Sequence, residues 1–350
     1  MITILIPTMN RPDFLTRLIR YYADLNFSHS ISIGDASDSH HAQETKRLVE
    51  RLEGKLNIAY QPCFGLSIAQ TVAKLNQAVT TPYATLIADD DFLVPKGVEA
   101  CVDFLEKKSE YTAAHGAGIL FTLKESGAYG DMVASSEYKL PVICETAASQ
   151  RLRQYLKNYS VVLFSIHRSD VWKKMWEVAS TIADTSFSAE LLPSCLSAVL
   201  GKTAEIDCLY LIRQGHDRRY LLADSYDWLT SPKWQEGYET FDQALARALA
   251  EIDGASPERA HEVVKEAFWA YLNNCFQKKF KKRYQKTKDS ARLKSMVESV
   301  PFGDCARSLW RRSRGFISDN GSSLTDLIKP SSPYYSDFRT IYDLVTKKGF

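Results

Sequence analysis

The sequence predicts an α/β protein with a mostly parallel sheet flanked by helices and followed by a helical C-terminal region. In the N-terminal half, short apolar and β-branched runs alternate with segments of helical periodicity, as in sheets built from strand–helix–strand units. From Tyr238 onward the pattern is almost wholly helical. The chain has 350 residues, more than one hydrophobic core usually holds, so we expect one large domain and a smaller one.

Strand and helix signals follow one another along the first 110 residues. Asn10 and Pro12 start a helix after the first strand, and Asp38 or Ser39 can cap the helix after the second. Pro82 ends the third helix, so the fourth strand opens directly after it. The predicted strands are 3–6, 31–34, 56–60 and 83–88, and the predicted helices begin near residues 10, 38, 67 and 95.

The signals weaken after residue 110. Strands are expected at 113–123, 161–166 and 206–212, and helices at 169–178 and 187–200. The stretch 223–236 is rich in Asp, Ser, Thr and Trp. We therefore expect it to link a domain at 1–222 to a helical, basic region at 237–350.

Composition places the chain among ordinary globular proteins. No apolar stretch approaches the length of a membrane-spanning helix, and the N-terminus enters strand-like sequence without a basic leader. We therefore expect a cytoplasmic protein. The seven cysteines lack any C-x-x-C spacing, which favours reduced thiols over a zinc site or a disulfide framework.

Positive charge gathers in the tail. Residues 256–350 carry 19 Lys and Arg against 10 Asp and Glu, whereas the rest of the chain is acidic. Segments 277–284 and 310–314 interleave cations with aromatic residues. Such a helix face can lie on anionic lipid, at about 1 kcal/mol per basic residue. The alternatives are a solvated face that covers the sheet and a surface for single-stranded nucleic acid, which the acidic body disfavours.

Three consecutive carboxylates, Asp89, Asp90 and Asp91, follow the fourth predicted strand. They should lie at its carboxyl end, where open α/β sheets bind ligands. Adjacent carboxylates repel by roughly 1 kcal/mol in water and about 4 at a protein surface unless a cation or shared protons relieve them. Such oxygen ligands suit Mg²⁺ or Mn²⁺, and extended backbone would put Asp89 and Asp91 on one face. The alternative is a solvated acidic turn.

The usual phosphate-binding loops are missing from the sequence. The turn after the first strand, residues 7–12, contains no glycine, and no Walker A sequence occurs. This turn therefore cannot bring backbone amides close to a pyrophosphate as glycine-rich loops do. A dehydrogenase or a P-loop enzyme is disfavoured, and a metal ion on the aspartates becomes the expected phosphate anchor.

Four motifs occur in order, at residues 4–11 (ILIPTMNR), 33–38 (IGDASD), 64–67 (FGLS) and 81–92 (TPY, then IADDDF). In order and spacing they resemble the family 2-like glycosyltransferases of GT-A fold, in particular a bacterial branch with a D-D-D-F metal motif. The match covers about residues 1–215. The resemblance implies transfer of a sugar from a nucleotide-sugar, UDP-linked more often than GDP-linked, to a glycan or lipid-linked acceptor in bacterial surface polysaccharide or glycoconjugate synthesis.

The resemblance also assigns roles to individual residues. The first motif would border the nucleotide, and the acid after the second strand would accept a hydrogen bond from the base or ribose. The Asp triple would hold Mg²⁺ or Mn²⁺, a Lewis acid for the leaving diphosphate. Turn formation and helix capping are the alternative for Asp35 and Asp38. The residues implied at the donor and its metal are Pro7, Thr8, Arg11, Asp35, Asp89, Asp90 and Asp91.

An inverting enzyme of this family also needs a base for the acceptor hydroxyl. The family places an acid at a helix start about a hundred residues after the metal motif, where this chain has Glu190. Asp184 is the second candidate because the common Glu-Asp pair is absent. The alternatives are a first-turn acid favoured by the helix dipole, and a retaining enzyme that needs no base there.

Two further residues follow the strand at 206–212. His216 is a candidate metal ligand because GT-A enzymes often complete the metal shell from this region, and Asp217 could support it. A lone surface histidine is the alternative. Arg213 could instead contact the diphosphate through its fork of donors.

The sequence thus predicts a metal-dependent glycosyltransferase, with possible peripheral contact to the inner face of the cytoplasmic membrane. One alternative is a sugar-phosphate nucleotidyltransferase, whose glycine-rich loop is absent here. Another is a catalytically silent module that binds a glycan or a partner and has kept the fold. The donor base and sugar, the acceptor and the oligomeric state are not specified by the sequence.

Overall fold

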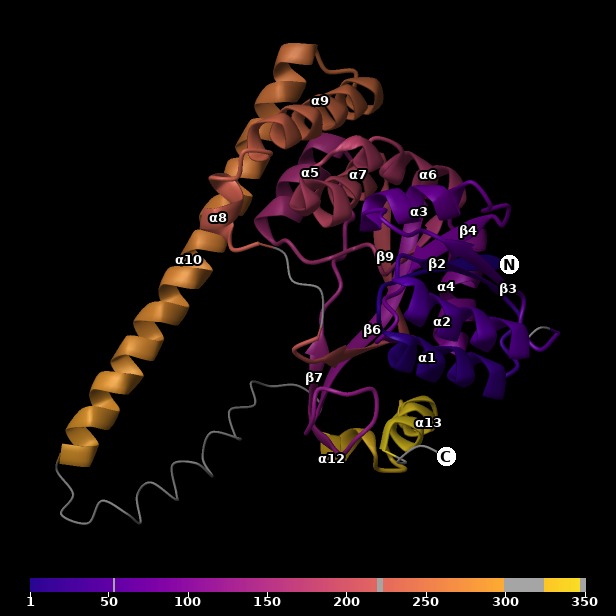
Figure 1. Ribbon diagram of the computed structural model, residues 1–350. Helices are drawn as coiled ribbons and strands as arrows, with labels where there is room; N and C mark the ends of the chain where they lie inside the picture. Colours follow the sequence, from indigo (N-terminus) through magenta and orange to yellow (C-terminus); the bar gives the residue numbers. More distant parts are fainter. Residues whose placement is uncertain (53, 219–222, 299–323, 347–350) are drawn as a thin grey trace.

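The computed structural model of the chain describes residues 1–52, 54–218, 223–298 and 324–346. Within them, nine strands form one sheet with helices on both faces (Figure 1). This arrangement confirms the predicted α/β class. The strands are β1 (Ile2–Thr8), β2 (Ser30–Asp35), β3 (Ile58–Pro62), β4 (Tyr83–Leu86), β5 (Phe92–Leu93), β6 (Tyr111–Leu123), β7 (Met132–Tyr138), β8 (Ile166–Arg168) and β9 (Lys202–Gly215).

The sheet has the order β3-β2-β1-β4-β8-β6-β9-β5, with β7 paired to β6. The first four strands in this order are parallel, and β6 pairs with β9 in parallel over most of its length. The short strands β5 and β8, together with β7, pair antiparallel to their neighbours. The sheet is therefore mostly parallel, as expected, and the carboxyl ends of β1, β2 and β4 meet at one edge.

Two hydrophobic cores cover the two faces of the sheet. Along β1, Ile4 and Ile6 join the core under α1, α2 and α4, whereas Leu5 joins the core under α3, α5, α6 and α7. This alternation follows from the two-residue period of a strand. These helices are α1 (Pro12–Asp24), α2 (Ser39–Arg51), α3 (Ile68–Asn76), α4 (Pro95–Lys107), α5 (Ala148–Lys157), α6 (Ser169–Glu177) and α7 (Leu192–Leu200).

The helical C-terminal region packs on the second of these cores. Helix α9 (Trp234–Asp253) and the first turns of α10 (Pro257–Glu298) share the core with α5 and α7. Gly237 allows α9 to lie close, because a Cβ at this position would come within 2.8 Å of the Phe187 ring. The stretch expected to be a linker contains α8 (Ser225–Leu229) and the buried side chain of Trp228. A domain boundary at 223–236 stays a prediction.

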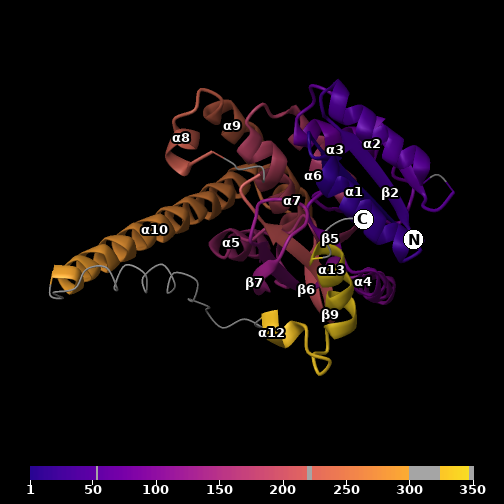
Figure 2. The same cartoon turned by 60° about the horizontal axis from the view of Figure 1, so that its bottom comes forward.

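The rest of α10 extends away from the sheet in both views (Figures 1 and 2). No helix in the described ranges is both long and apolar enough to cross a membrane. The last helices, α12 (Leu324–Leu327) and α13 (Tyr335–Thr346), return to the body beside β7.

Two expectations about strands were wrong. The fourth strand does not continue to residue 88 but ends at Leu86, and the first two aspartates lie in a turn in which the Asp91 amide donates to Ala88. The apolar run at 161–166 is mostly a turn, and its strand starts only at Ile166. Val162 and Leu163 are nevertheless buried, because an apolar run can enter the core without joining a strand ladder.

Candidate active site

The carboxyl ends of β1, β2 and β4 bring together residues from three sequence motifs. Thr8 ends β1 and lies opposite Asp35, the last residue of β2. The Thr8 hydroxyl donates a 2.6 Å hydrogen bond to Oδ2 of Asp89, just beyond β4. Residues far apart in the sequence thus form one continuous polar edge.

The two acids at and just beyond the end of β2 have different local roles. Asp35 is buried and accepts hydrogen bonds from the Ser37 amide at 2.9 Å and the Tyr60 hydroxyl at 3.2 Å. Asp38 is the N-cap of α2 and accepts from the amides of His40 and His41. Capping, one of the two interpretations of Asp38, is therefore its role in the structure.

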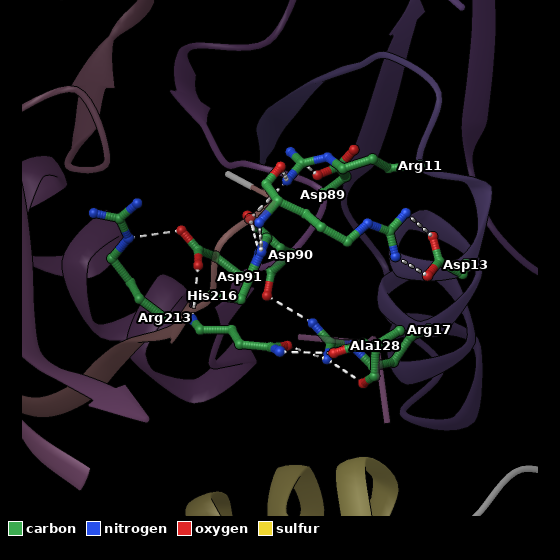
Figure 3. A network of polar contacts seen from close by, with 12 residues as sticks. Arg11, Asp13, Arg17, Asp89, Asp90, Asp91, Ala128, Arg213 and His216 are labelled. Atoms are coloured by element: carbon green, nitrogen blue, oxygen red, sulfur yellow. Dashed lines mark hydrogen bonds and ion pairs between the residues drawn. The ribbon is translucent and has the colours of Figure 1, made fainter. Parts of the chain in front are cut away.

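The three aspartates are buried and bound to basic side chains (Figure 3). Arg11 forms ion pairs with Asp89 and, at 2.9 Å, with Asp90. Nε of Arg213 donates to Oδ2 of Asp91 at 2.7 Å. Their mutual repulsion is therefore relieved by guanidinium groups.

The extended backbone on which the expected alternation along the Asp triple depends is not present. The chain turns at Asp89 and Asp90, so the two-residue period of a strand does not place Asp89 and Asp91 on one face. Asp89 and Asp90 share Arg11, while Asp91 accepts from Arg213 and from the Gln214 amide at 3.0 Å. Asp91 is therefore bound to β9 through Arg213 and Gln214.

Arg17 is a fully buried cation that the sequence analysis missed. Its guanidinium lies between the rings of Phe14 and Phe92, at 5.2 and 4.8 Å from their centroids. It donates to the Asp90 carbonyl at 2.7 Å and to Oε1 of Gln214 at 2.5 Å (Figure 3). One signal was available, since Arg17 follows Phe14 by three positions and so lies on the apolar face of α1.

Burial and pairing move the pKa values of the aspartates in opposite directions. Burial raises the pKa of Asp89 to about 7 and that of Asp91 to about 6, although Arg11 and Arg213 counteract it. For Asp90, the hydrogen bond from His216 and the charge of Arg11 outweigh burial and lower the pKa to about 2. Asp90 is therefore the acid most firmly held in its ionised form.

His216 contacts the Asp triple directly. Its Nε2 donates to Oδ2 of Asp90 at 2.7 Å, and its Nδ1 accepts from the Arg218 amide at 3.1 Å. These two bonds fix the proton on Nε2, and the ring stacks on Phe14. The adjacent Asp217 instead accepts from the Ser126 hydroxyl at 3.3 Å, so Asp90 is the acid that supports the histidine.

The expected metal ion can be tested against this arrangement. Carboxylate oxygens suit Mg²⁺ or Mn²⁺ chemically. Among the described residues, however, no group of three or more His, Cys, Asp or Glu side chains could hold a metal ion. Both oxygens of Asp91 accept from protein N–H groups, and both oxygens of Asp89 face Thr8 or Arg11. Protein groups thus neutralise the carboxylates in this arrangement, and a metal ion could bind Asp89 or Asp91 only by displacing Arg11 or Arg213.

Glu190 lies in a different environment from the aspartates. It is partly buried in η2 (Phe187–Leu191), a π-helical turn that leads into α7. Its Oε1 accepts a 2.8 Å hydrogen bond from the Tyr159 hydroxyl. Burial raises its pKa, while Tyr159 and the charge of Arg213 act in the opposite direction. Arg213 is thus coupled electrostatically to both Asp91 and Glu190.

Asp184, the second candidate base, has a structural role. Its Oδ1 accepts from the Phe187 amide and from the Trp228 indole N–H, each at 3.0 Å. The carboxylate is buried and holds the start of the π-helical turn against α8. Oδ2 of Asp184 and Oε2 of Glu190 both lack a hydrogen-bond partner in the described part of the chain, but Asp184 is the more deeply buried residue and is held by two N–H groups.

Comparison with protein-family models gives no match, and comparison with curated proteins gives none either. Among solved structures, the chain is similar to S. aureus TarS, at 13% identity and a TM-score of 0.47 over 79% of this chain and 43% of TarS. A TarS 1–349 structure in complex with UDP gives 13% identity and a TM-score of 0.48 over 79% of this chain and 72% of that one. A TarS 1–349 structure in complex with UDP-GlcNAc gives 13% identity and a TM-score of 0.43 over 77% of this chain and 89% of that one. These values describe a remote likeness.

Proposed function

We propose that the chain is a glycosyltransferase that moves a sugar from a nucleoside diphosphate to a hydroxyl group of a glycan or lipid-linked acceptor. The observation that carries the proposal is the meeting of Thr8, Asp35 and Asp89 at the ends of three parallel strands. Their motifs lie far apart in the sequence, yet they are the ones that the family 2-like resemblance assigns to the donor. Pro7 belongs to the same edge.

The donor diphosphate would lie beside the arginines that now neutralise the aspartates. Arg11 and Arg213 are partly exposed, with 17% and 24% of their side chains accessible, whereas Asp89 and Asp91 are almost fully covered. A diphosphate would therefore meet the guanidinium groups before the carboxylates. Arginine donors match phosphate oxygens in bidentate geometry. The buried Asp35 would fix the ribose or base, and UDP is the favoured nucleotide.

Metal dependence, which the sequence predicts, would have to accommodate these ion pairs. Asp89, Asp91 and His216 are the proposed ligands of Mg²⁺ or Mn²⁺, and Asp90 would support them. In the structure, Arg11 is ion-paired with Asp89 and Arg213 with Asp91. We expect ion and diphosphate to bind together, because the diphosphate offers the released guanidinium groups a new anionic partner.

In the proposed reaction the acceptor hydroxyl oxygen attacks the anomeric carbon of the donor sugar. The bond from that carbon to the phosphate oxygen breaks, and its electron pair leaves with the nucleoside diphosphate. Attack from the face opposite the leaving group gives a glycoside of inverted configuration, and Glu190 takes the proton of the hydroxyl group. A raised pKa suits this role, because a base works best when its pKa approaches the working pH.

The acceptor and the setting are also proposals. The exposed rings of Phe280 and Tyr284 and the exposed Lys281 lie on the part of α10 that leaves the body, whereas segment 310–314 falls outside the described residues. Such a surface would suit peripheral contact with an anionic membrane that carries a lipid-linked acceptor. Co-sedimentation with vesicles of phosphatidylglycerol tests this, with phosphatidylcholine vesicles as the control. Equal binding to both would contradict it.

A donor panel tests the function itself. The protein is incubated with UDP-, GDP- and dTDP-sugars, with Mn²⁺ or Mg²⁺ and again with chelator, and nucleoside diphosphate release is followed. Release from one donor class supports a glycosyltransferase. Pyrophosphate release from a nucleoside triphosphate and a sugar phosphate would instead indicate a nucleotidyltransferase. Binding of a glycan without turnover of any donor would indicate a non-catalytic module.

A further inference from the structure

The side chain of Glu190 is fixed through only one of its two oxygens. Oε1 accepts the hydrogen bond from Tyr159 at 2.8 Å, and Oε2 has no hydrogen-bond partner in the ranges that the structure describes. The π-helical turn beneath it is an unusual local structure, and such turns occur frequently at functional sites. This geometry leaves one oxygen oriented and available.

Tyr159 in turn contacts two aromatic rings, which come from different helices. The ring of Tyr155, on α5, meets it at 5.4 Å and an interplanar angle of 63°. The ring of Tyr271, on α10, meets it at 5.1 Å and 72°. Both contacts are edge-to-face, the arrangement that aromatic pairs prefer. The hydroxyl of Tyr159 is therefore aimed by its ring packing.

A second contact ties α10 to the same segment. The Asn274 amide group donates to the Lys157 carbonyl at 2.7 Å, at the end of α5 and two residues before Tyr159. The Tyr155 hydroxyl donates to the Ser160 carbonyl at 2.8 Å, one residue after it. The backbone on both sides of Tyr159 is thus fixed by α5 and α10.

From these contacts we propose that Tyr159 is a positioning residue for Glu190 and that α10 contributes to the active site through Tyr271. The inference rests on the proposed function, in which Glu190 is the base. A neutral hydroxyl can orient a carboxylate and leave most of its basicity. A bound guanidinium would lower the basicity more strongly. The C-terminal helical region would then be part of the catalytic unit.

The decisive variant is Tyr159→Phe, which keeps the ring and removes the hydroxyl. A hydrogen bond to a carboxylate lowers its pKa, so its loss should raise the pKa of Glu190. Because a base acts in its ionised form, the acidic limb of the kcat profile should move to higher pH, by roughly half to one pH unit. We expect kcat at neutral pH to fall about 3- to 10-fold, with donor Kd unchanged.

Two further variants distinguish a specific effect on the orientation of Glu190 from a general loss of packing around it. Tyr238→Phe removes the hydroxyl of a tyrosine of α9 that has no ring contact with Tyr159, and its acidic limb should stay where the parent protein has it. Tyr271→Leu removes the edge contact from α10 and should shift the limb in the same direction as Tyr159→Phe, by less. An equal shift in Tyr238→Phe would overturn the positioning role. A parent-like profile in Tyr271→Leu would overturn the contribution of α10.

The pKa of Glu190 can also be measured without turnover. Carbon-13 NMR of glutamate carboxyl groups, with Glu190→Gln to assign the resonance, reports it directly in the whole protein. If the parent releases nucleoside diphosphate but Tyr159→Phe leaves this pKa unchanged, the positioning role is wrong and the proposed function stands. If the pKa rises in Tyr159→Phe but the parent turns over no donor, the contact is as described and the proposed function fails.

Discussion

The Asp triple and Glu190 are two acidic sites with opposite kinds of hydrogen-bond partner. Asp89, Asp90 and Asp91 are matched by guanidinium groups and an imidazole, at distances typical of ion pairs. Glu190 has a neutral tyrosine hydroxyl as its hydrogen-bond partner. The first group balances charge, and the second leaves a carboxylate free to accept a proton.

This difference suggests that the two acidic sites have different functions, ligand binding and proton transfer. A charge-balanced cluster at the ends of parallel strands is suited to recognise a charged ligand, because one set of ion pairs can be exchanged for another. A carboxylate with a raised pKa and one unpaired oxygen is suited to proton transfer. Arg213 lies between the two, paired with Asp91 and electrostatically coupled to Glu190.

The largest effect is expected at the second group. Glu190→Gln keeps the shape of the side chain and removes its basicity, so we expect kcat to fall about 10²- to 10⁴-fold. Donor affinity should stay within about twofold, measured by calorimetric titration. Glu177→Gln, at an exposed acid of α6, serves as the control. A loss of less than fivefold would end the assignment of Glu190 as base.

A large loss of stability is expected at the first group. Asp91→Asn leaves the guanidinium of Arg213 without its ionised partner, and breaking a buried pair in this way costs about 3 kcal/mol of unfolding free energy. Asp13→Asn breaks the exposed pair with Arg218 and should cost less than about 1 kcal/mol. Urea denaturation measures both. Similar costs would show that burial does not distinguish the two pairs.

The affinity for Mn²⁺ is expected to depend on the nucleotide. If the arginines must release the aspartates first, Mn²⁺ alone should bind weakly, and UDP should tighten its binding at least about tenfold. By linkage, Mn²⁺ should tighten UDP binding by the same factor. Calorimetry in both orders measures this. Equally tight Mn²⁺ binding with and without UDP would contradict the role given to Arg11 and Arg213.

The smallest expected effect is a displacement of the acidic limb in the pH profile of kcat. Burial raises the pKa of Glu190 above its ordinary value of 4.5, and the residue is active when ionised. With saturating donor, kcat should therefore fall as the pH drops through this raised pKa, so that the acidic limb lies above pH 4.5. A limb at or below that value would place the titrating group outside the Glu190 environment.

Sequence patterns predicted the sheet and the edge where the motifs meet, because both depend on local periodicity. The strands β1 and β2 and the helix α1 were read from apolar spacing and from Pro12. The aspartates were placed at the end of a strand because a charged run follows a buried one. Each of these signals lies within about ten neighbouring residues.

What the sequence could not predict depends on contacts between distant residues. Arg213 and Asp91 are 122 positions apart, and Tyr159 and Glu190 are 31 apart. No spacing rule joins them, so the neutralisation of the aspartates and the partner of Glu190 were missed. Strand β7 was missed for another reason: most of its side chains are at least partly exposed, so it lacks an apolar pattern.

The central claim is that the Asp triple serves nucleotide binding and Glu190 serves proton transfer. It is tested most directly by titrating UDP, GDP and dTDP, each with Mn²⁺, into the parent protein and into the variants Asp91→Asn and Glu190→Gln. The parent should bind one of these nucleotides. Glu190→Gln should bind it as tightly as the parent does, and Asp91→Asn at least about tenfold more weakly. Unchanged nucleotide affinity in a folded Asp91→Asn protein, or its loss in Glu190→Gln, would contradict the account.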